Sequence, residues 1–314
     1  MSNIDLSVVV PLYNEVESLP ELVEWIARVA RENNLSYEII MIDDGSTDGS
    51  WEVVERLAKS YPAIRGISFM RNYGKSAALY CGFEKACGDV VVTMDADLQD
   101  SPDEIPELRR MILEECYDLV SGWKRKRYDP IGKRWPSKFF NFTARLMSGI
   151  KLHDFNCGLK AYRRKVVKSI EVYGEMHRYI PILAKHAGFK RIGEKVVEHH
   201  ERKYGKSKFG IERMVKGYLD LISVTFMSHF GRSPMYLFGG LGTAMFLLGF
   251  VAVVWIIVEK LVSGYPLTNQ PLFYLSLVAI VLGVQLFLSG FLGEMINRRS
   301  ADRNKYLIDK DLDK

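Results

Sequence analysis

Two long uncharged segments near the carboxyl end set the strongest limit on how this chain can fold. Neither Met235–Val258 nor Pro271–Gly293 contains an Asp, Glu, Lys or Arg residue. Each segment exceeds the roughly 18 apolar residues that predict a transmembrane helix. Helices of soluble domains rarely run this long without a polar face, which argues against a buried core hairpin. We therefore expect membrane-spanning helices at 234–258 and 271–296.

The distribution of basic residues predicts the orientation of these helices. Arg232 precedes the first helix, and the connecting loop 259–270 contains Lys260 as its single basic residue. The first basic residues after the second helix are Arg298, Arg299, Arg303 and Lys305. Because basic residues favour the cytoplasmic side, we expect a multi-pass protein of the inner (plasma) membrane with an external loop and a cytoplasmic tail at 297–314. The opening residues lack the basic region of a signal sequence, so the amino-terminal domain is also expected in the cytoplasm.

Net charge and cysteine content argue against a nucleic-acid partner, a cysteine metal site and a disulfide framework. The net charge of +5, from 43 basic and 38 acidic residues, is too small to imply a nucleic-acid partner. The four cysteines have neither metal-ligand spacing nor the pattern of a disulfide framework. We expect them to be reduced thiols in a reducing compartment.

Residues 1–210 alternate short apolar segments with amphipathic ones. The pattern predicts an α/β domain around a mainly parallel sheet, followed by amphipathic juxtamembrane helices at 211–233. Strands are expected at 6–10, 37–42, 64–69 and 89–94, and a helix at 19–33. Ligands of such sheets bind beyond the carboxyl ends of the strands. Three polar motifs are therefore expected on one edge, at 11–15, 43–44 and 95–97.

The motif Asp95-Ala96-Asp97 follows a strand of the buried type. Two carboxylates at a strand end can hold a divalent cation and, through it, a diphosphate. We expect Asp97 and Gln99 to be direct ligands of Mg²⁺ or Mn²⁺, and Asp95 to bond ribose or a metal-bound water. Such a cation stabilises the charge of a departing diphosphate, which gives Asp97 a catalytic role. Alone, an Asp-x-Asp motif also fits a solvated turn.

Four motifs occur in the order typical of one enzyme family. They are Val10–Glu15, Asp43–Ser46, Arg71–Lys75 and Asp95–Gln99. With the two carboxy-terminal helices, the chain resembles glycosyltransferase family 2 over about residues 5–300, and within it the polyisoprenyl-phosphate branch of dolichol-phosphate mannose synthase and bactoprenol glucosyltransferase type. The resemblance implies a GT-A-type nucleotide-sugar domain. A Rossmann dehydrogenase would instead place a glycine-rich motif after the first strand, where this chain has no glycine.

The resemblance also implies a donor site for a UDP- or GDP-sugar. The residues expected to bind this nucleotide sugar are Pro11, Tyr13, Glu15, Asp43, Asp44, Lys75, Asp95, Arg202 and Lys208. The first three frame the nucleoside pocket. A carboxylate accepts from a base N–H, so Asp43 or Asp44 is expected to contact the base, with helix capping as the alternative. Arg202 and Lys208 belong to a segment similar to the family's mobile loop and would clamp the diphosphate.

The acceptor side is expected between the basic segment 124–134 and residue 154. By resemblance, Lys133, Arg134 and Ser137 contact the phosphate of a lipid acceptor, although a solvated charge run over a core helix is the alternative. Asp154 occupies the position of the family's proposed catalytic base. A polyprenyl phosphate has a second pKa of about 6 and is largely ionised at neutral pH. Asp154 is therefore expected either to deprotonate the acceptor or to orient it, with capping of its own loop as the alternative.

Together these features predict an inverting transfer of one sugar, glucose or mannose, to undecaprenyl or dolichyl phosphate at the inner leaflet. Inversion is expected because no enzymic nucleophile is evident. The alternatives are a membrane glycosyltransferase that builds a polysaccharide and a non-catalytic lipid-carrier or flippase subunit. A Gln-x-x-Arg-Trp motif, typical of the polysaccharide enzymes, is absent. The glycine-rich segment 239–242 permits close helix packing and hence a homo-oligomer.

The predicted orientation can be tested by cysteine labelling. A Ser263→Cys variant should react with a membrane-impermeant reagent in intact cells, because residue 263 lies in the predicted external loop. A Ser2→Cys variant should react only after permeabilisation. The opposite pattern would separate the amino-terminal domain from cytoplasmic nucleotide sugars and would contradict the predicted function as well.

Overall fold

The computed structural model describes residues 4–125, 141–201, 203–204, 223, 226, 233–264, 266 and 270–298. The chain divides into two compact units, Met1–Thr225 and Phe226–Lys314, and each unit is described by itself. Five predicted site residues lie outside the described residues, namely Lys133, Arg134, Ser137, Arg202 and Lys208. Most of the predicted juxtamembrane segment 211–233 and the tail 299–314 also lie outside them.

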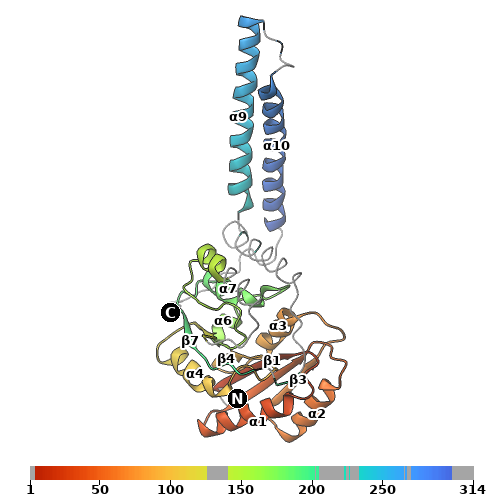
Figure 1. Cartoon of the computed structure of the whole chain (residues 1–314), viewed down its shortest axis with the longest axis vertical. Helices are drawn as coiled ribbons and strands as arrows, with labels where there is room; N and C mark the ends of the chain where they lie inside the picture. The colour runs from red at the N-terminus through yellow and green to blue at the C-terminus, as the bar shows by residue number, and fades with distance from the viewer. Residues whose placement is uncertain are drawn as a thin grey trace, which may run out of the picture. The chain divides into compact units, whose positions relative to one another are not determined.

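A seven-stranded sheet forms the centre of the first unit (Figure 1). The strands in chain order are β1 (Leu6–Leu12), β2 (Tyr37–Asp43), β3 (Ile64–Ser68), β4 (Val90–Thr93), β5 (Leu119–Trp123), β6 (Lys160–Arg163) and β7 (Ile192–Val196). Their order in the sheet is β3-β2-β1-β4-β6-β5-β7. β6 is antiparallel to both of its neighbours, and every other pair is parallel. The expected mainly parallel α/β fold is therefore confirmed.

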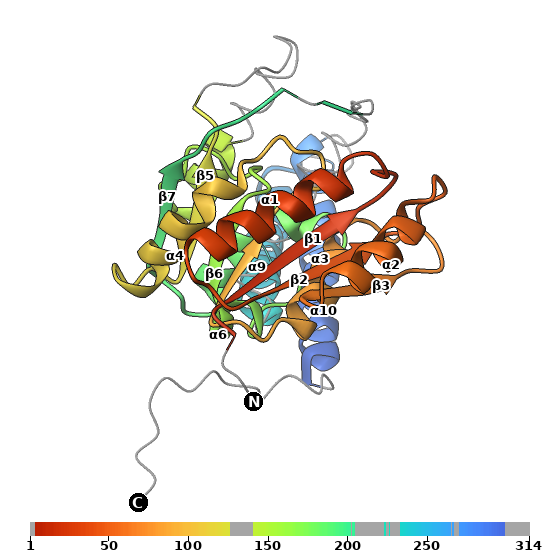
Figure 2. The same ribbon diagram turned by 90° about the horizontal axis from the view of Figure 1, so that it is seen from below.

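Helices cover both faces of this sheet (Figure 2). They are α1 (Leu19–Glu32), α2 (Ser50–Ser60), α3 (Lys75–Lys85), α4 (Ile105–Leu113), α6 (Arg164–Val167) and α7 (Ile180–His186), with short 3₁₀ helices η1 (Pro102–Glu104) and η2 (Met176–Arg178). Val8 and Val10 of β1 belong to the core beneath α1, α2 and α4, whereas Val9 belongs to the core beneath α3, α6 and α7. Because successive strand residues face opposite sides, burial on both faces explains the uninterrupted apolar sequence of β1.

The register of the parallel strands brings their carboxyl ends together. Leu12 of β1 lies opposite Asp43 of β2, and Asp43 lies opposite Ser68 of β3. On the other side of β1, Val9 lies opposite Thr93 of β4. β5 also ends on this side, because β6 runs antiparallel to both β4 and β5. The segments after β1, β2, β4 and β5 therefore leave the sheet at the same side, here called the carboxyl edge, and the predicted convergence of the three polar motifs is confirmed.

The second unit contains two long apolar helices, α9 (Pro234–Ser263) and α10 (Pro271–Arg298). Segments Pro234–Val262 and Pro271–Ile296 are long and apolar enough to cross a membrane. Only 17% of the most apolar 18-residue window of each segment is buried. A core helix of a soluble protein would have most of these side chains buried, so the exposure supports a lipid environment over the core-hairpin alternative.

Glycines allow α9 and α10 to pack closely against each other. A Cβ atom on Gly242 would lie 2.5 Å from the carbonyl oxygen of Gly283, and one on Gly283 would lie 2.7 Å from the carbonyl oxygen of Gly242. Close backbone approach at small residues is typical of membrane helix pairs. Gly242 therefore makes a contact within one chain, while Gly240 faces open space. The glycine-rich segment thus has a role that requires no second copy of the chain.

Candidate active site

Two loops at the carboxyl edge are joined by hydrogen bonds. In the β1–α1 loop, the backbone N–H of Asn14 donates to Oγ of Ser46 (2.9 Å), and Oδ1 of Asn14 accepts from the N–H of Thr47 (2.8 Å). The N–H of Glu15 donates to Oγ of Ser50 (3.0 Å). Asn14 has φ of 56°, in the left-handed region that asparagine tolerates better than most residues. These bonds fix the predicted nucleoside-pocket residues on either side of Asn14 against the β2–α2 loop.

Asp43 and Asp44 are both buried and hold loops in place. Asp43 accepts from the N–H of Ser46 (3.0 Å) and from the hydroxyl of Ser68 (3.3 Å). Asp44 accepts from the two consecutive N–H groups of residues 73–74, at 2.6 and 2.9 Å. Burial raises the pKa of Asp44 above its usual value, although those two N–H groups act in the opposite direction. Both carboxylates thus hold neighbouring loops in place through these hydrogen bonds. Contact of either one with the nucleobase of the donor stays a prediction.

Asp95 is held in its ionised form between two other segments. Its Oδ1 forms an ion pair with the ammonium group of Lys75, the first residue of α3. Burial alone would raise the pKa of Asp95, but the charges of Lys75 and Lys124 outweigh burial and lower it to about 2. On its other side, Gly158 approaches so closely that a Cβ atom there would lie 2.5 Å from Oδ2 of Asp95. The side chains of Asp95 and Lys75 remain about a third exposed (34% and 31%), so a ligand can still reach them.

The turn from Asp97 to Gln99 brings the predicted metal ligands close together. Oδ1 of Asp97 accepts from the N–H of Gln99 (3.2 Å), and Asp97 is largely buried. Leu98 between them has φ of 60°, and its buried side chain belongs to the core beneath α1 and α4. A left-handed leucine costs of order 1–3 kcal/mol and persists only where its surroundings require it. The anchored side chain of Leu98 therefore maintains a strained turn that places Asp97 beside Gln99.

The oxygen donors at this turn fit a divalent cation that is shared with a ligand. Asp95 and Asp97 supply carboxylates and Gln99 supplies an amide oxygen, the hard donors that Mg²⁺ and Mn²⁺ prefer. Within the described residues, no group of three or more His, Cys, Asp or Glu side chains is arranged to hold a metal. Mg²⁺ is commonly bound by one or two carboxylates together with substrate phosphates. The donor set fits that arrangement rather than a metal site built from protein alone.

Residues 199 and 200 lie beside this turn. The N–H of His200 donates to the carbonyl oxygen of Gln99 (2.9 Å), and His199 forms an isolated antiparallel bridge with Asp100. Further along, Lys203 forms an ion pair with Glu21 of α1 (2.7 Å). His199 and His200, three and two residues before Arg202, therefore lie next to the predicted metal-binding turn.

Asp154 lies where two other segments meet. It is buried, its Oδ1 accepts from the N–H of Asn156 (3.0 Å), and its carbonyl oxygen accepts from the hydroxyl of Ser121 in β5 (3.3 Å). The N–H of Phe155 donates to Oδ1 of Asn141, the first described residue of a helix at 141–148 (3.3 Å). The described residues on both sides of the predicted acceptor segment thus contact residues 154–155.

Two polar residues near Asp95 were not predicted. Lys160 is buried in β6 and donates to the carbonyl oxygen of Cys157, and burial lowers the pKa of its ammonium group. Burial also lowers the pKa of His177 well below its usual value, with a further contribution from Lys75, so this imidazole is neutral at pH 7. His177 contacts the hydroxyl of Ser76 through Nδ1 (3.1 Å). Neither Lys160, in a strand with two charged residues among four, nor His177 is singled out by the sequence.

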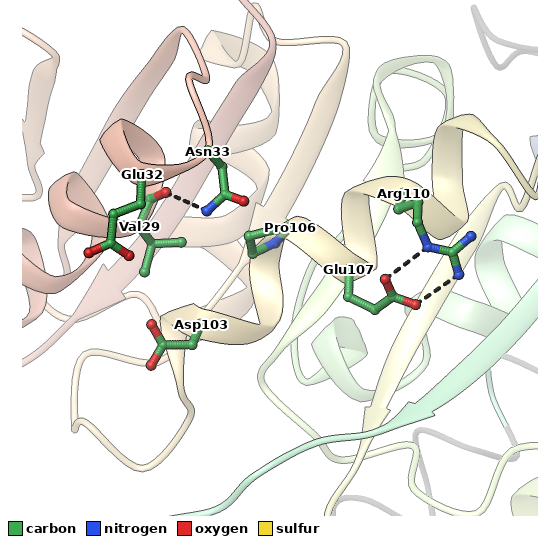
Figure 3. A pocket seen from close by; sticks show the side chains of 7 residues that line it. All are labelled: Val29, Glu32, Asn33, Asp103, Pro106, Glu107 and Arg110. Atoms are coloured by element: carbon green, nitrogen blue, oxygen red, sulfur yellow. Dashed lines mark hydrogen bonds and ion pairs between the residues drawn. The ribbon is translucent and has the colours of Figure 1, made fainter.

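A surface groove of about 480 Å³ lies between α1 and α4 (Figure 3). Its lining residues are Val29, Glu32, Asn33, Asp103, Pro106, Glu107 and Arg110. None of them is a predicted site residue. The guanidinium group of Arg110 is paired with Glu107 (2.8 Å), and the other charged lining residues, Glu32 and Asp103, are acidic and supply no positive charge for a diphosphate. The groove is therefore a poor candidate for the donor site.

Residues 7–171 match the family described as Glycosyl transferase family 2. The dodecaprenyl-phosphate galacturonate synthase of Rhizobium johnstonii is 35% identical over 301 residues, which cover 95% of this chain and 89% of that protein. The undecaprenyl-phosphate 4-deoxy-4-formamido-L-arabinose transferase of Pseudomonas aeruginosa is 38% identical over 314 residues, which cover 98% of this chain and 90% of that protein. Both relatives are thus similar over nearly the whole chain.

Solved structures share the fold at lower identity. Glucosyl-3-phosphoglycerate synthase from Mycobacterium tuberculosis, crystallised with Mn²⁺, UDP-glucose and phosphoglyceric acid, aligns with a TM-score of 0.53 and 21% identity, covering 72% of this chain and 79% of that one. Mannosyl-3-phosphoglycerate synthase from Rubrobacter xylanophilus aligns with a TM-score of 0.56 and 18% identity, covering 72% of this chain and 75% of that one. These likenesses confirm the expected GT-A-type architecture.

The close approach of Gly158 to Asp95 can be tested with a Gly158→Ala variant. The added methyl group must displace the Asp95 carboxylate, so we expect turnover to fall by at least about tenfold, as for misplaced groups in other active sites. Gly66→Ala is the matched control, because its Cβ would meet the Trp51 ring of α2 at 2.9 Å, outside the site. Melting temperature and turnover should be measured for both variants. Equal turnover in the two would show that Asp95 does not need the space beside Gly158.

Proposed function

Because the chain belongs to glycosyltransferase family 2, within its polyprenyl-phosphate sugar transferases, we propose that it transfers one sugar from a UDP-sugar to a polyprenyl phosphate at the inner membrane leaflet, with inversion. One observation carries the proposal most directly. Gly158 packs against Asp95 on the donor side, and Asp154 lies four residues earlier in the same segment. The segment 154–158, which carries the carboxylate assigned to the acceptor, thus packs against the carboxylate assigned to the donor.

The sugar is proposed to be a modified one. The two relatives are named for galacturonate and for 4-deoxy-4-formamido-L-arabinose, and not for the glucose or mannose expected from the sequence. UDP is the preferred nucleotide because the M. tuberculosis neighbour of the same fold was crystallised with UDP-glucose. The UDP-linked forms of the relatives' two sugars are therefore the first donors to test.

The proposed reaction is a single displacement at the anomeric carbon. An oxygen of the lipid phosphate forms the new bond to that carbon, the bond to the diphosphate breaks, and UDP leaves with the bonding electron pair. Asp97, Gln99 and Asp95 would hold a Mg²⁺ or Mn²⁺ ion, which when bound supplies positive charge to the leaving diphosphate. Lys75 keeps Asp95 ionised and in place. Asp154, on the acceptor side, orients the lipid phosphate.

The two apolar helices are proposed to hold the enzyme at the depth of its lipid acceptor. A polyprenyl phosphate stays in the bilayer, so tethering raises the effective concentration of enzyme and acceptor. The proposed division is a cytoplasmic catalytic domain at 1–210, juxtamembrane helices at 211–233, and spans at 234–258 and 271–296 joined by an external loop. A non-catalytic carrier or flippase subunit would have no use for the strained metal-binding turn at 97–99 or for an ionised Asp95.

Transfer by the purified full chain tests the function. The protein in nanodiscs with undecaprenyl phosphate should be supplied in turn with UDP-galacturonate, UDP-4-deoxy-4-formamido-L-arabinose, UDP-glucose and GDP-mannose. We expect one of the first two donors to give a lipid that carries one phosphate and one sugar by mass spectrometry, with UDP released in equal amount. Release of UDP that does not depend on the lipid, or addition of several sugars, would contradict the proposal.

Removal of the central metal ligand should reduce turnover. In Asp97→Asn, one charged oxygen donor is lost, and we expect turnover to fall about 10²-fold or more, as when one electrostatic stabiliser is removed. Asp103→Asn is the matched control, because its side chain is 54% exposed and bonds to Trp25 and Arg28 outside the site. Both variants should be titrated with Mn²⁺. Full activity of Asp97→Asn in excess chelator would exclude the assigned role.

The pH dependence of Asp154→Asn separates the two roles considered for this residue. If Asp154 removes a proton, the variant should lose most activity at pH 6 and recover at higher pH, where the lipid phosphate with its second pKa of about 6 is fully ionised. If Asp154 orients the acceptor, the loss should be similar across this range, and this is the outcome we expect. A pH–rate profile normalised to the wild type decides between them, and strong recovery in alkali would establish the base role.

A further inference from the structure

Asp100 carries a buried charge for which the proposed reaction has no use. Its side chain is fully buried, with 0% exposed, although it immediately follows the metal-binding turn. Its Oδ1 lies 2.6 Å from the ammonium group of Lys124, which is itself 14% exposed, and Oδ2 has no hydrogen-bond partner among the described residues. A carboxylate in such a place depends on its counterion, because an unpaired buried charge is strongly destabilising.

This ion pair joins segments that carry different parts of the site. Asp100 ends the turn that holds Asp97 and Gln99, while Lys124 directly follows β5 and begins the basic segment 124–134 of the acceptor side. The backbone of Asp100 also bridges to His199, at the start of the segment that contains Arg202. The turn assigned to the metal therefore meets, at Asp100, the described starts of the two segments assigned to the lipid phosphate and the diphosphate.

We infer that Asp100 is a positioning residue which, through Lys124, sets the metal-binding turn and the start of the basic segment at a fixed separation. The inference rests on the proposed function, since it concerns how the donor and acceptor sites are assembled. Asp100 touches neither substrate; it acts by holding Lys124 and the turn at 97–99. Loss of the pair should therefore weaken metal binding and lipid binding together, which a role in stability alone would not do.

A second ion pair, with a buried carboxylate and a half-exposed arginine, provides the control. Glu38, at the amino end of β2, has a side chain that is 4% exposed and lies 2.9 Å from Arg65. Glu38 also accepts from the hydroxyl of Ser7 (2.6 Å) and from the N–H of Cys87 (2.7 Å). This pair lies at the opposite edge of the sheet from the carboxyl edge. Glu38→Gln thus removes a buried charge from an ion pair without touching the three loops.

The test compares Asp100→Asn, Lys124→Met, the double variant Asp100→Asn/Lys124→Met and Glu38→Gln in the full-length protein. Three quantities should be measured: the affinity for Mn²⁺ in the presence of UDP, by electron paramagnetic resonance; the KM for undecaprenyl phosphate; and the melting temperature. We expect each single substitution of the pair to weaken Mn²⁺ affinity about 10- to 100-fold, the range found for groups that orient metal ligands, and to raise the lipid KM. The double variant should be no worse than the poorer single variant, because no buried charge is left unpaired.

The outcomes separate positioning from stability. Glu38→Gln should lower the melting temperature and leave Mn²⁺ affinity and lipid KM unchanged. If the variants of the pair do the same, the inference is overturned. If Asp100→Asn does not fold, Lys124→Met and the conservative Lys124→Arg decide the question, because Arg keeps the ion pair and should recover most of the Mn²⁺ affinity that Met loses. Mn²⁺ affinity is measured without sugar transfer, so failure of the wild type to transfer a sugar would count against the proposed function alone.

Discussion

The parallel pairing of β1 with both β2 and β4 is the constraint on which the rest of the catalytic unit depends. It fixes the ends of three strands at one edge of the sheet, so that the loops after Leu12, Asp43 and Thr93 must share the same space. The core residues of β1 alternate between the two faces and are fully buried, which leaves this register no freedom to slip. A shift by one residue would exchange the side chains of β1 between the two cores, which are packed for different residues, and would displace the polar motifs from one another.

Burial then determines how these loops are held. Asp43, Asp44, Asp97, Asp100 and Asp154 are all buried at or near the carboxyl edge. Asp43, Asp44 and Asp100 bond to other segments, through a hydroxyl, two backbone N–H groups and a lysine respectively. Asp97 and Asp154 instead accept from N–H groups two residues ahead and so fix their own loops. Polar groups buried in this way are costly unless they are satisfied, so each bond fixes the loops that it joins. The exception is the Asp95–Lys75 pair, which stays about a third exposed. This pair is charged, fixed and open to a ligand, as a donor site requires.

The sequence allowed β1 to β4, the convergence of their polar motifs and the two apolar helices to be predicted, because apolar periodicity and strand-end motifs are local signals, whereas β5 and β7 were not predicted. The antiparallel insertion of β6 could not be predicted, since nothing in Lys160–Arg163 specifies the direction of pairing. His177 and the Asp100–Lys124 pair were missed for a similar reason, because their partners are 101 and 24 residues away in the chain and only the tertiary fold brings them together. The expected sugars, glucose and mannose, differ from those for which the two relatives are named. Recognition of the hydroxyl groups of a sugar depends on the geometry of loops, which the sequence motifs do not specify.

A cryo-EM structure of the full chain with Mn²⁺ and UDP is the most direct test of the assigned site. We expect Mn²⁺ between the diphosphate and the side chains of Asp97 and Gln99, with the uracil ring beside Tyr13 at the carboxyl edge. Asp95 should remain paired with Lys75 and lie within reach of the ribose or of a metal-bound water. UDP bound elsewhere, for example in the groove between α1 and α4, or a metal coordinated without Asp97, would contradict the assignment of the carboxyl edge as the donor site.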